Sequence, residues 1–382
     1  MKLPVKFLFL GKDPIIEAKV LNTLLKEDEE KSKNLKIIDC TFYENQNFPV
    51  SKEIPNFFEE RIPRSIKIDL DQISDSKKSE HNLYMIPSEE NFTQIMNLFN
   101  IKKSDHIVCY DRHGIYSSAR LWYVLKLFGM KNVYVLNGGY PSWVRENFPI
   151  DRQKFNPNLI ITGERNDTNN YLFKKDMSKL IQTEEMLYKS YNFLKNKSDD
   201  IIIDVRTPKR SFGEQDEPFP VRRRGSIRYS ANIYYRSILD KNFLLLNKPL
   251  IKKYLESELI ELDKELVIYS GVGISACVFI LALDFIGKDK NVKLYEGGWA
   301  EMGNVEVTGN PIIQKFVKYE ERSPKEKTDE ILSKMDKKAI ERTERANKHE
   351  YKLRDIKEKN KEYLKKKIKA KENDYESPDE KF

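Results

Sequence analysis

The chain has 382 residues, and its 68 Lys and Arg residues only slightly outnumber its 60 Asp and Glu residues, which gives a net charge of +8 on a mixed surface. This length allows two domains and an appendage at roughly 150 residues per domain, and the mixed charge gives no reason to expect a nucleic-acid partner. Three widely spaced cysteines, Cys40, Cys109 and Cys277, are too few for a disulfide framework or a zinc cluster, so we expect a reducing compartment, no metal site and no cofactor.

The N-terminal segment begins with an apolar stretch that is too short to cross a membrane. Pro4 and the lack of a small-residue cleavage site argue against a signal peptide, and the segment is not the Arg-rich and Ser-rich helix of a typical organelle presequence. We therefore expect a cytoplasmic protein with no membrane span, and import into mitochondria remains an open alternative.

The chain repeats one series of elements. Residues 36–39 and 201–204 are short apolar runs that each end in an aspartate, and they lie 165 positions apart. Residues 106–111 and 265–270 each form a predicted strand that leads into a glycine loop, an apolar helix, another strand and a Gly-Gly pair, and corresponding positions here are 159 residues apart. Chance similarity would not keep one register over so many elements. The pattern predicts a tandem α/β duplication in which each domain has a mostly parallel sheet, helices on both faces and functional loops at the carboxyl ends of the strands.

From about residue 320 onward, the composition shifts to Lys and Glu with a sparse apolar stripe. Charged residues interrupt that stripe, so a solvated charged helix is favoured over a weak coiled coil that binds a protein partner, and both hypotheses stay open. A polar stretch before the second repeat indicates a linker. We therefore divide the chain into a first domain at residues 1–160, a linker at 161–185, a second domain at 186–319 and a charged helical tail at 320–382.

Four segments identify the kind of domain that is duplicated. They are residues 111–120 (Asp-Arg-His-Gly-Ile-Tyr-Ser-Ser-Ala-Arg), 136–143 (Leu-Asn-Gly-Gly-Tyr-Pro-Ser-Trp), 203–210 (Ile-Asp-Val-Arg-Thr-Pro-Lys-Arg) and 296–299 (Glu-Gly-Gly-Trp). In their order, these segments resemble the tandem rhodanese family, the thiosulfate and 3-mercaptopyruvate sulfurtransferases, over roughly residues 36–303. The resemblance implies two rhodanese-like domains, of which the first carries an inert loop at Asp111.

The second loop, residues 270–275, departs from the family at its first position. The resemblance implies a sulfur-accepting cysteine there, and this chain has Ser270 at that catalytic position. A thiolate can attack a sulfur atom, whereas a serine oxygen needs an adjacent base and cannot hold a persulfide, and none of the four histidines stands in a recognisable Ser-His-Asp context. The resemblance also implies that the remaining loop residues wrap backbone N–H groups around a bound anion, which is physically reasonable at a helix N-terminus. These residues are Gly271, Val272, Gly273, Ile274 and Ser275.

Three other functional positions of the family also differ. By resemblance, Tyr84 stands at a histidine of the mercaptopyruvate enzymes, Val272 at a serine of their loop, and Phe219 at one of two arginines that hold the substrate carboxylate. Arg210 aligns with the other arginine. The neighbouring arginines at 222–224 are candidates for a substitute charge, although bidentate recognition of a carboxylate needs a fixed guanidinium and sequence proximity does not supply one.

Four substitutions together favour a non-catalytic relative that binds a small sulfur-containing or other anion, with a protein partner at the tail as an additional hypothesis. The alternative is an active sulfurtransferase that transfers sulfane sulfur to a thiol or cyanide, and it would need another sulfur acceptor. Cys277 is a poor candidate, because its position two helical turns beyond Ser270 predicts a buried packing residue. Phosphoryl hydrolysis is a third alternative, but phosphatases of this fold also resemble rhodanese in using a loop cysteine.

Overall fold

The computed structural model describes residues 11–26, 34–42, 57–75, 83–154, 172–193, 200–305 and 313–314, which all fall within one compact unit at residues 1–323. The predicted charged tail at residues 320–382 lies outside the described residues, as do residues 155–171 around the expected start of the linker. The four domain boundaries therefore remain a prediction.

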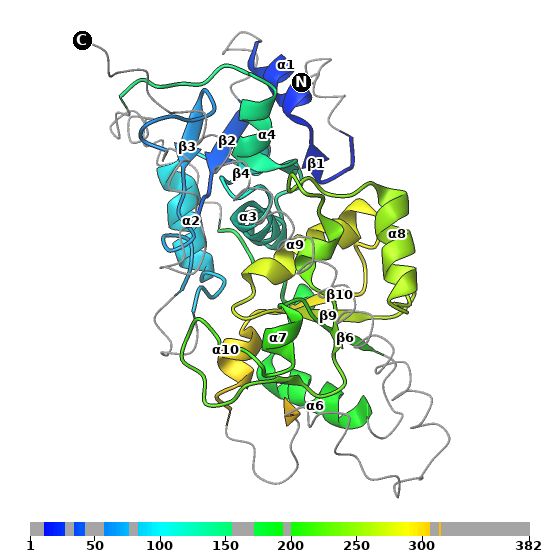
Figure 1. Ribbon diagram of the computed structural model, residues 1–382. Coiled ribbons are helices and arrows are strands. Elements are labelled where there is room, and N and C mark those ends of the chain that lie inside the picture. The colour runs from blue at the N-terminus through cyan, green and yellow to red at the C-terminus, as the bar shows by residue number, and fades with distance from the viewer. Residues whose placement is uncertain are drawn as a thin grey trace, which may run out of the picture. The chain divides into compact units, whose positions relative to one another are not determined.

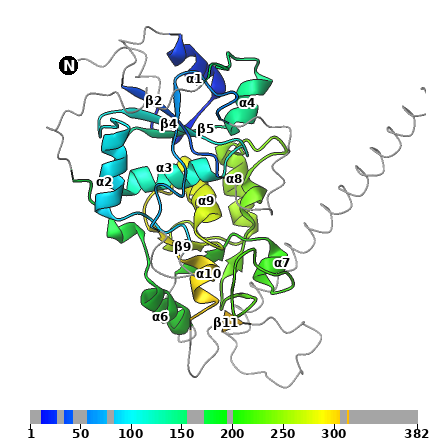
Figure 2. The same ribbon diagram turned by 90° about the vertical axis from the view of Figure 1, so that its left-hand side faces the viewer.

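The first half is a parallel sheet covered by helices on both faces (Figure 1). Its strands are β1 (Ile15–Ile16), β2 (Leu35–Asp39), β3 (Ser65–Lys67), β4 (His106–Tyr110) and β5 (Val133–Leu136), and its helices are α1 (Ala18–Leu25), α2 (Glu89–Leu98), α3 (Ser117–Leu127) and α4 (Gly139–Arg145). Among the described residues, the strand order is β1-β5-β4-β2-β3 with every neighbouring pair parallel. Successive side chains of a strand point to opposite faces, so Val108 packs with α1 and α4 while Cys109 packs with α2 and α3. Figure 2 shows these two helix pairs on opposite sides of the sheet.

The second half repeats this architecture. Its main strands are β6 (Ile201–Asp204), β8 (Ala231–Asn232), β9 (Leu266–Tyr269) and β10 (Val292–Tyr295), and its longer helices are α6 (Thr183–Phe193), α8 (Lys248–Ser257), α9 (Ile274–Phe285) and α10 (Gly298–Met302). The described strands have the order β10-β9-β6-β8, again all parallel, so β10, β9, β6 and β8 correspond to β5, β4, β2 and β3 of the first half. Short elements complete it: η2 (Met177–Lys179), α7 (Pro208–Ser211), η3 (Tyr235–Ile238) and the antiparallel pair β7 (Ser226–Ile227) and β11 (Ile313–Gln314).

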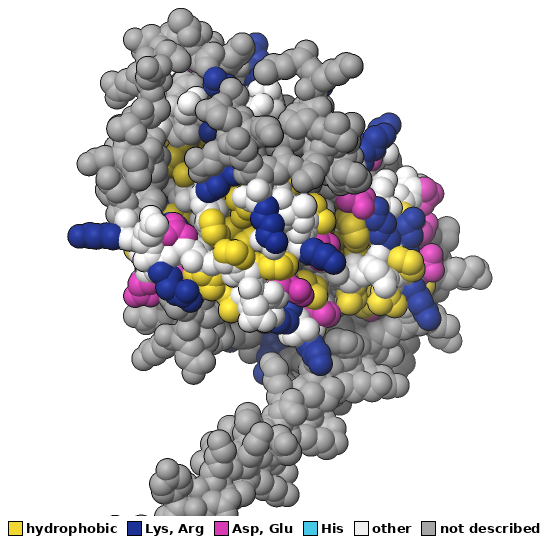
Figure 3. Space-filling view, turned by 90° about the horizontal axis from the view of Figure 1, so that it is seen from above, with side chains coloured by type: hydrophobic (Ala, Val, Ile, Leu, Met, Phe, Trp, Pro, Cys, Tyr) yellow, Lys and Arg dark blue, Asp and Glu magenta, His cyan; other side chains and the backbone are white. Residues whose placement is uncertain are grey.

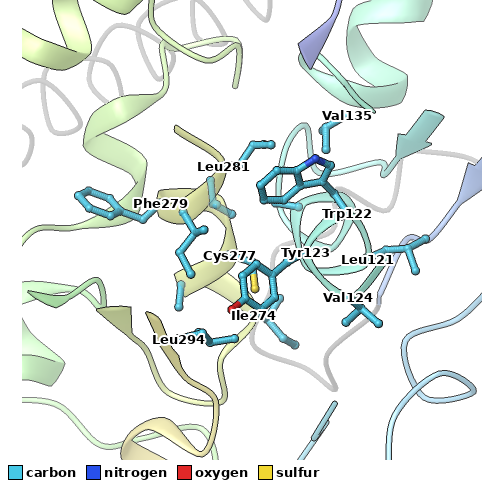
Figure 4. Packing of buried hydrophobic residues seen from close by; sticks show 14 of the residues in the cluster. Leu121, Trp122, Tyr123, Val124, Val135, Ile274, Cys277, Phe279, Leu281 and Leu294 are labelled. Carbon is cyan, nitrogen blue, oxygen red and sulfur yellow. The ribbon is translucent and has the colours of Figure 1, made fainter. Parts of the chain in front are cut away.

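Helices α3 and α9 join the two halves. They lie side by side in both ribbon views, and their buried side chains belong to one hydrophobic cluster that extends from the first sheet to the second (Figures 1 and 2). Figure 4 shows Trp122 and Tyr123 of α3 beside Ile274, Cys277 and Leu281 of α9. Helix α9 is apolar nearly all round because it is covered by the sheet on one side and by α3 on the other.

Contacts between the halves also follow the duplicated register. The amide of Leu245 donates to Asn137 Oδ1 at 2.9 Å, and the amide of Ile86 donates to Glu296 Oε2 at 2.8 Å. The two donors are 159 positions apart in the sequence, and so are the two acceptors. Each half therefore donates one backbone amide to the side chain that follows the last parallel strand of the other half. The predicted tandem duplication of a parallel α/β domain is confirmed.

The surface carries charges of both signs. Figure 3 shows basic side chains on the face seen from above, with acidic and hydrophobic side chains between them on the part that the structure describes. This distribution agrees with the nearly balanced composition.

Candidate functional site

Ser270 lies in the tight loop that connects β9 to α9. Its side chain is 1% exposed, and its Oγ has no hydrogen-bond partner among the described residues. Gly273 has φ +76°, which a residue with a side chain rarely adopts and which lets the chain turn directly into α9. The carbonyls of Ser270 and Gly271 accept hydrogen bonds from the amides of Trp299 and Ala300 at 2.8 and 2.9 Å, so the start of α10 fixes the loop through its carbonyl groups.

The corresponding loop of the first half is closed by its own carboxylate. Asp111 is fully buried and accepts amide hydrogen bonds from His113 at 2.8 Å, from Tyr116 at 2.8 Å and from Ser118 at 2.9 Å. The hydroxyl of Ser118 adds a fourth bond at 2.6 Å. The amide cradle at the N-terminus of α3 is thus already occupied by an anion that belongs to the chain.

The loop of the second half has the same cradle without a carboxylate. The positions 159 residues after the three donors are Val272, Ser275 and Cys277. No described residue accepts a hydrogen bond from the amides of Val272 and Ser275, whereas Cys277 lies far enough inside α9 for its amide to donate within the helix. Ile274 begins α9, and its side chain is buried in the core. Because the first amides of a helix have no intrahelical acceptor, this end of α9 is suited to a bound anion.

Ser270 opens on a pocket of about 540 Å³ at the carboxyl ends of the second sheet's strands. Arginine, tyrosine and hydroxyl side chains dominate its wall, and no histidine is among the lining residues. The lining comprises Tyr116, Arg206, Thr207, Arg210, Gln215, Asp216, Glu217, Pro218, Phe219, Tyr234, Tyr235, Arg236, Ser270, Gly271, Val272 and Ser275.

Arg210 lies directly against the loop, as the sequence predicts. A Cβ atom added at Gly271 would come within 2.7 Å of Arg210 Nη2 and 2.9 Å of Phe219 Cε1, so a larger residue here would displace these two side chains. Arg210 donates from Nε to Glu217 Oε2 at 2.9 Å and also from Nη2, while Arg206 donates to Glu217 Oε1 at 2.6 Å. Glu217 thus holds the Arg210 guanidinium beside the cradle and offsets part of its charge.

The three arginines at 222–224 do not line this pocket. The Arg222 amide and Arg223 Nη1 donate to residues 304–305 at 2.9 and 2.8 Å, and Arg224 pairs with an aspartate of the pocket rim. The additional guanidinium in the pocket wall comes from Arg236, whose Cζ lies 4.2 Å from the centroid of the Phe243 ring. The arginines at 222–224 therefore do not lie where they could supply the substitute charge in this pocket.

Thr207, Glu217 and Arg236 are among the pocket residues that the sequence analysis did not assign to the site. Thr207 and Arg236 follow the ends of β6 and β8, and the rule that functional loops follow parallel strands would have found both. Thr207 Oγ1 is buried without a hydrogen-bond partner among the described residues, as Ser270 Oγ is. No local sequence pattern identifies Glu217, because its role as the acceptor for Arg206 and Arg210 depends on how the loop that carries it folds back toward them.

Tyr84, which stands at the aligned histidine position, is absent from the pocket wall. Its backbone has φ +55°, and its ring packs edge to face on Phe42 with a centroid distance of 4.7 Å. The tyrosine at this position therefore packs within the first half, and its carbonyl accepts a hydrogen bond from Arg120 Nη2 at 2.8 Å.

All three cysteines are buried, and none is placed to act as a relocated sulfur acceptor. Cys40, Cys109 and Cys277 are each 0% exposed. Burial raises the pKa of all three thiols, in the case of Cys277 to about 11 although the nearby Arg120 lowers it. The thiols are therefore protonated at neutral pH, whereas a thiolate is required for attack on sulfur.

A thiol-reactive dye tests this arrangement. We expect none of the three cysteines to react with DTNB in the native protein over minutes at pH 8, and all three to react after unfolding in guanidinium. Rapid labelling of one native thiol, located by peptide mass spectrometry, would contradict the burial described above.

The described part of the chain offers neither a metal-binding cluster nor a membrane-spanning helix. It contains no group of three or more His, Cys, Asp and Glu side chains placed to hold a metal ion. Its helices also include none with the length and apolar character needed to cross a membrane.

Comparisons with known proteins agree with this geometry. The rhodanese-like domain family matches residues 20–146 and 189–304. Over 298 residues the chain is 30% identical to thiosulfate/3-mercaptopyruvate sulfurtransferase 1, mitochondrial, of Arabidopsis thaliana, covering 76% of each protein. It is 28% identical over 273 residues to 3-mercaptopyruvate sulfurtransferase of Mus musculus, covering 71% of this chain and 85% of the mouse protein.

Solved structures show the same architecture. Tum1 of Saccharomyces cerevisiae matches with a TM-score of 0.62 at 25% identity, over 76% of this chain and 95% of Tum1. SseA of Escherichia coli, described as a 3-mercaptopyruvate sulfotransferase with the rhodanese fold, matches with a TM-score of 0.60 at 23% identity, over 75% of this chain and 99% of SseA. A sulfur transferase subunit of yeast mitochondrial complex I matches with a TM-score of 0.62 at 23% identity, over 76% of this chain and 95% of that subunit.

Proposed function

Because the chain belongs to the rhodanese-like family, we propose that it is a non-catalytic relative of the thiosulfate/3-mercaptopyruvate sulfurtransferases, one that binds a small anion in the loop at residues 270–275. One observation supports this proposal above all others. The amides of Val272 and Ser275 have no acceptor among the described residues, while their counterparts in the first half, His113 and Tyr116, both donate to the carboxylate of Asp111.

The proposed ligand is held by neutral and positive groups. The amides of Val272 and Ser275 at the start of α9 supply partial positive charge, and the buried hydroxyl of Ser270 supplies a further donor. Arg210 adds a guanidinium beside the loop. It is bonded to Glu217, a carboxylate that it shares with Arg206, and Arg206 is also paired with Asp204. A serine at the cradle brings no charge of its own, whereas a thiolate would repel an incoming anion.

Sulfur transfer lacks both a nucleophile and a base. Ser270 Oγ has no hydrogen-bond partner among the described residues that would remove its proton, and the pocket wall contains no histidine. Its tyrosines are poor bases as well, because burial raises the pKa of Tyr234 and Tyr235 further above their ordinary value. An active sulfurtransferase, the function in the names of the related proteins, would need an acceptor outside this pocket.

Two measurements on the native protein test the proposal together. Calorimetric titration is expected to detect one sulfate per chain, and incubation with thiosulfate or 3-mercaptopyruvate plus cyanide is expected to yield no thiocyanate above the protein-free control. Thiocyanate formation with repeated turnover would replace the proposal by an active sulfurtransferase. Absence of heat with sulfate, phosphate and small thiol acids would leave the loop as a structural element only.

The cellular setting is a further part of the proposal. We place the protein in a reducing compartment, the cytoplasm or the mitochondrion, which is supported by three cysteines without a disulfide and by an Arabidopsis relative named as mitochondrial. We also assign the charged tail a role in binding a protein partner. Removing residues 323–382 tests this role, because an unchanged oligomeric mass and unchanged recovery of partners would contradict it.

A further inference from the structure

A buried arginine from the first half lies directly behind the anion cradle of the second half. Arg120 belongs to α3 and is 2% exposed. Its Nη1 lies 3.8 Å from Cys277 Sγ and 3.2 Å from the place that a Cβ atom on Gly273 would take. The guanidinium therefore touches both the residue that turns the loop into α9 and a side chain of the first turn of that helix.

Arg120 forms a long ion pair with one carboxylate, that of Glu296. Its Nη2 donates to a neutral group, the carbonyl of Tyr84, and the carboxylate Oε2 of Glu296 is 3.9 Å away, beyond hydrogen-bond distance. That Oε2 is itself an acceptor for the amide of Ile86. A buried cation is unfavourable next to the N-terminus of a helix, because both are positive. An anion in the cradle would balance the two together.

The duplication shows the same complementarity. The counterpart of Arg120 in the 159-residue register is Phe279, which carries no charge. The first loop carries its own carboxylate, Asp111, and Phe279 stands in the other half at the position that corresponds to Arg120. The second loop has no carboxylate, and Arg120 lies behind it. A negative charge in the loop therefore goes with a neutral residue behind it, and a loop without that charge goes with a positive residue behind it. A role for Arg120 in packing alone would not require this pairing.

We propose that Arg120 is a positioning residue for anion binding at the 270–275 loop, so that the site is built from both halves of the chain. This inference rests on the proposed function. The unpartnered and buried hydroxyl of Ser270 marks the place of the ligand, and Arg120 supplies the positive charge on the other side of the loop. Anion occupancy then strengthens the contact between α3 and α9, because the arginine is best accommodated when the cradle is filled.

The test compares Arg120→Gln and Arg120→Lys with the native protein. We expect Arg120→Gln to weaken sulfate binding at least tenfold by calorimetry at constant ionic strength, and Arg120→Lys, which keeps the charge, to stay within about threefold of the native affinity. Lys126→Gln is the matched control, since it removes a positive charge from the same helix about 9 Å further along and should leave the affinity unchanged.

Thermal unfolding separates a binding role from a structural one. A merely structural Arg120 would lower the melting temperatures with and without sulfate by the same amount, whereas our proposal predicts that Arg120→Gln loses most of the sulfate-induced rise. If the native protein binds sulfate and Arg120→Gln binds it equally well, the inference is wrong while the proposed function stands. If Arg120→Gln fails to fold, Arg120→Lys decides: a full native rise in melting temperature supports the proposal, and loss of that rise in the folded lysine variant contradicts it. No sulfate binding by the native protein contradicts both.

Discussion

Replacing Ser270 by aspartate is expected to abolish sulfate binding and to make the protein more stable in the absence of anions. The new carboxylate would occupy the cradle as Asp111 does in the first half, where it accepts three amide hydrogen bonds and one from a hydroxyl. Charge-assisted bonds of this kind contribute about 1.5–3 kcal/mol each before the desolvation of the carboxylate is subtracted. We expect a net gain of roughly 1–3 kcal/mol, seen as a rise of a few degrees in melting temperature by calorimetry.

Asparagine at the same position is the control for this substitution. Ser270→Asn has nearly the shape of the aspartate variant but no charge, so it should stabilise the loop much less while still hindering sulfate. A Ser270→Asp variant that melts below the native protein and still binds sulfate with native affinity would show that the second loop does not form the cradle described here.

The reciprocal change in the first half provides a check within the same chain. Asp111→Ser would leave the amides of His113, Tyr116 and Ser118 without their acceptor in a fully buried place. Unsatisfied buried donors are costly, at about 1–3 kcal/mol each, so we expect a loss of roughly 4 kcal/mol or more in the free energy of unfolding measured with urea. A loss below about 1 kcal/mol would contradict the role given to the Asp111 carboxylate.

The sequence was sufficient for the features that depend on local pattern and on register. The 159-residue repeat predicted the strand, glycine loop and helix around both Asp111 and Ser270, because each of those elements is encoded by neighbouring residues. The same register identified which amides correspond in the two halves. Once the hydrogen bonds of Asp111 were known, the open donors of the second loop followed directly.

The wall of the pocket could not be predicted in the same way. The arginines at 222–224 are close to Phe219 in sequence, yet Arg222 and Arg223 hydrogen-bond to residues 304–305 at the end of α10. Arg236 reaches the pocket instead, because η3 follows β8 at the edge of the sheet. Which arginine lines the site depends on contacts between distant segments, and periodicity and spacing carry no information about these.

The buried polar cluster behind the loop was missed for a related reason. Arg120 belongs to a helix of the first half, and its neighbours Cys277 and Glu296 belong to the second half. Sequence reasoning treated each half as a unit with its own functional loop. The site became visible only when the packing of α3 on α9 placed residues from both halves side by side.

Restoring a thiol at position 270 is expected to produce the largest functional change. In Ser270→Cys the sulfur would stand where the amides at the N-terminus of α9 and the Arg210 guanidinium favour a negative charge, so its pKa should fall below that of an ordinary cysteine. The thiolate could attack the outer sulfur of thiosulfate, breaking its S–S bond and releasing sulfite to leave a protein persulfide. Cyanide would then take the outer sulfur as thiocyanate and release the thiolate. We expect thiocyanate formation at least tenfold above the native protein, although Val272 and Tyr84 still differ from the family and should keep the rate modest.

Two readouts make this prediction decisive. Ser270→Cys should react at a single thiol with iodoacetamide, a reagent smaller than DTNB, because position 270 borders the pocket although it is only 1% exposed, while Cys40, Cys109 and Cys277 are buried away from it. Ser270→Ala is the control, which keeps the loop but offers neither hydroxyl nor thiol and should give no thiocyanate. If the native protein turns over as fast as Ser270→Cys, the hydroxyl at 270 is no obstacle and the non-catalytic interpretation fails. If the new thiol is labelled but gives neither a protein-bound persulfide nor thiocyanate, the loop amides do not stabilise a sulfur anion, and the cradle assigned to this loop is wrong.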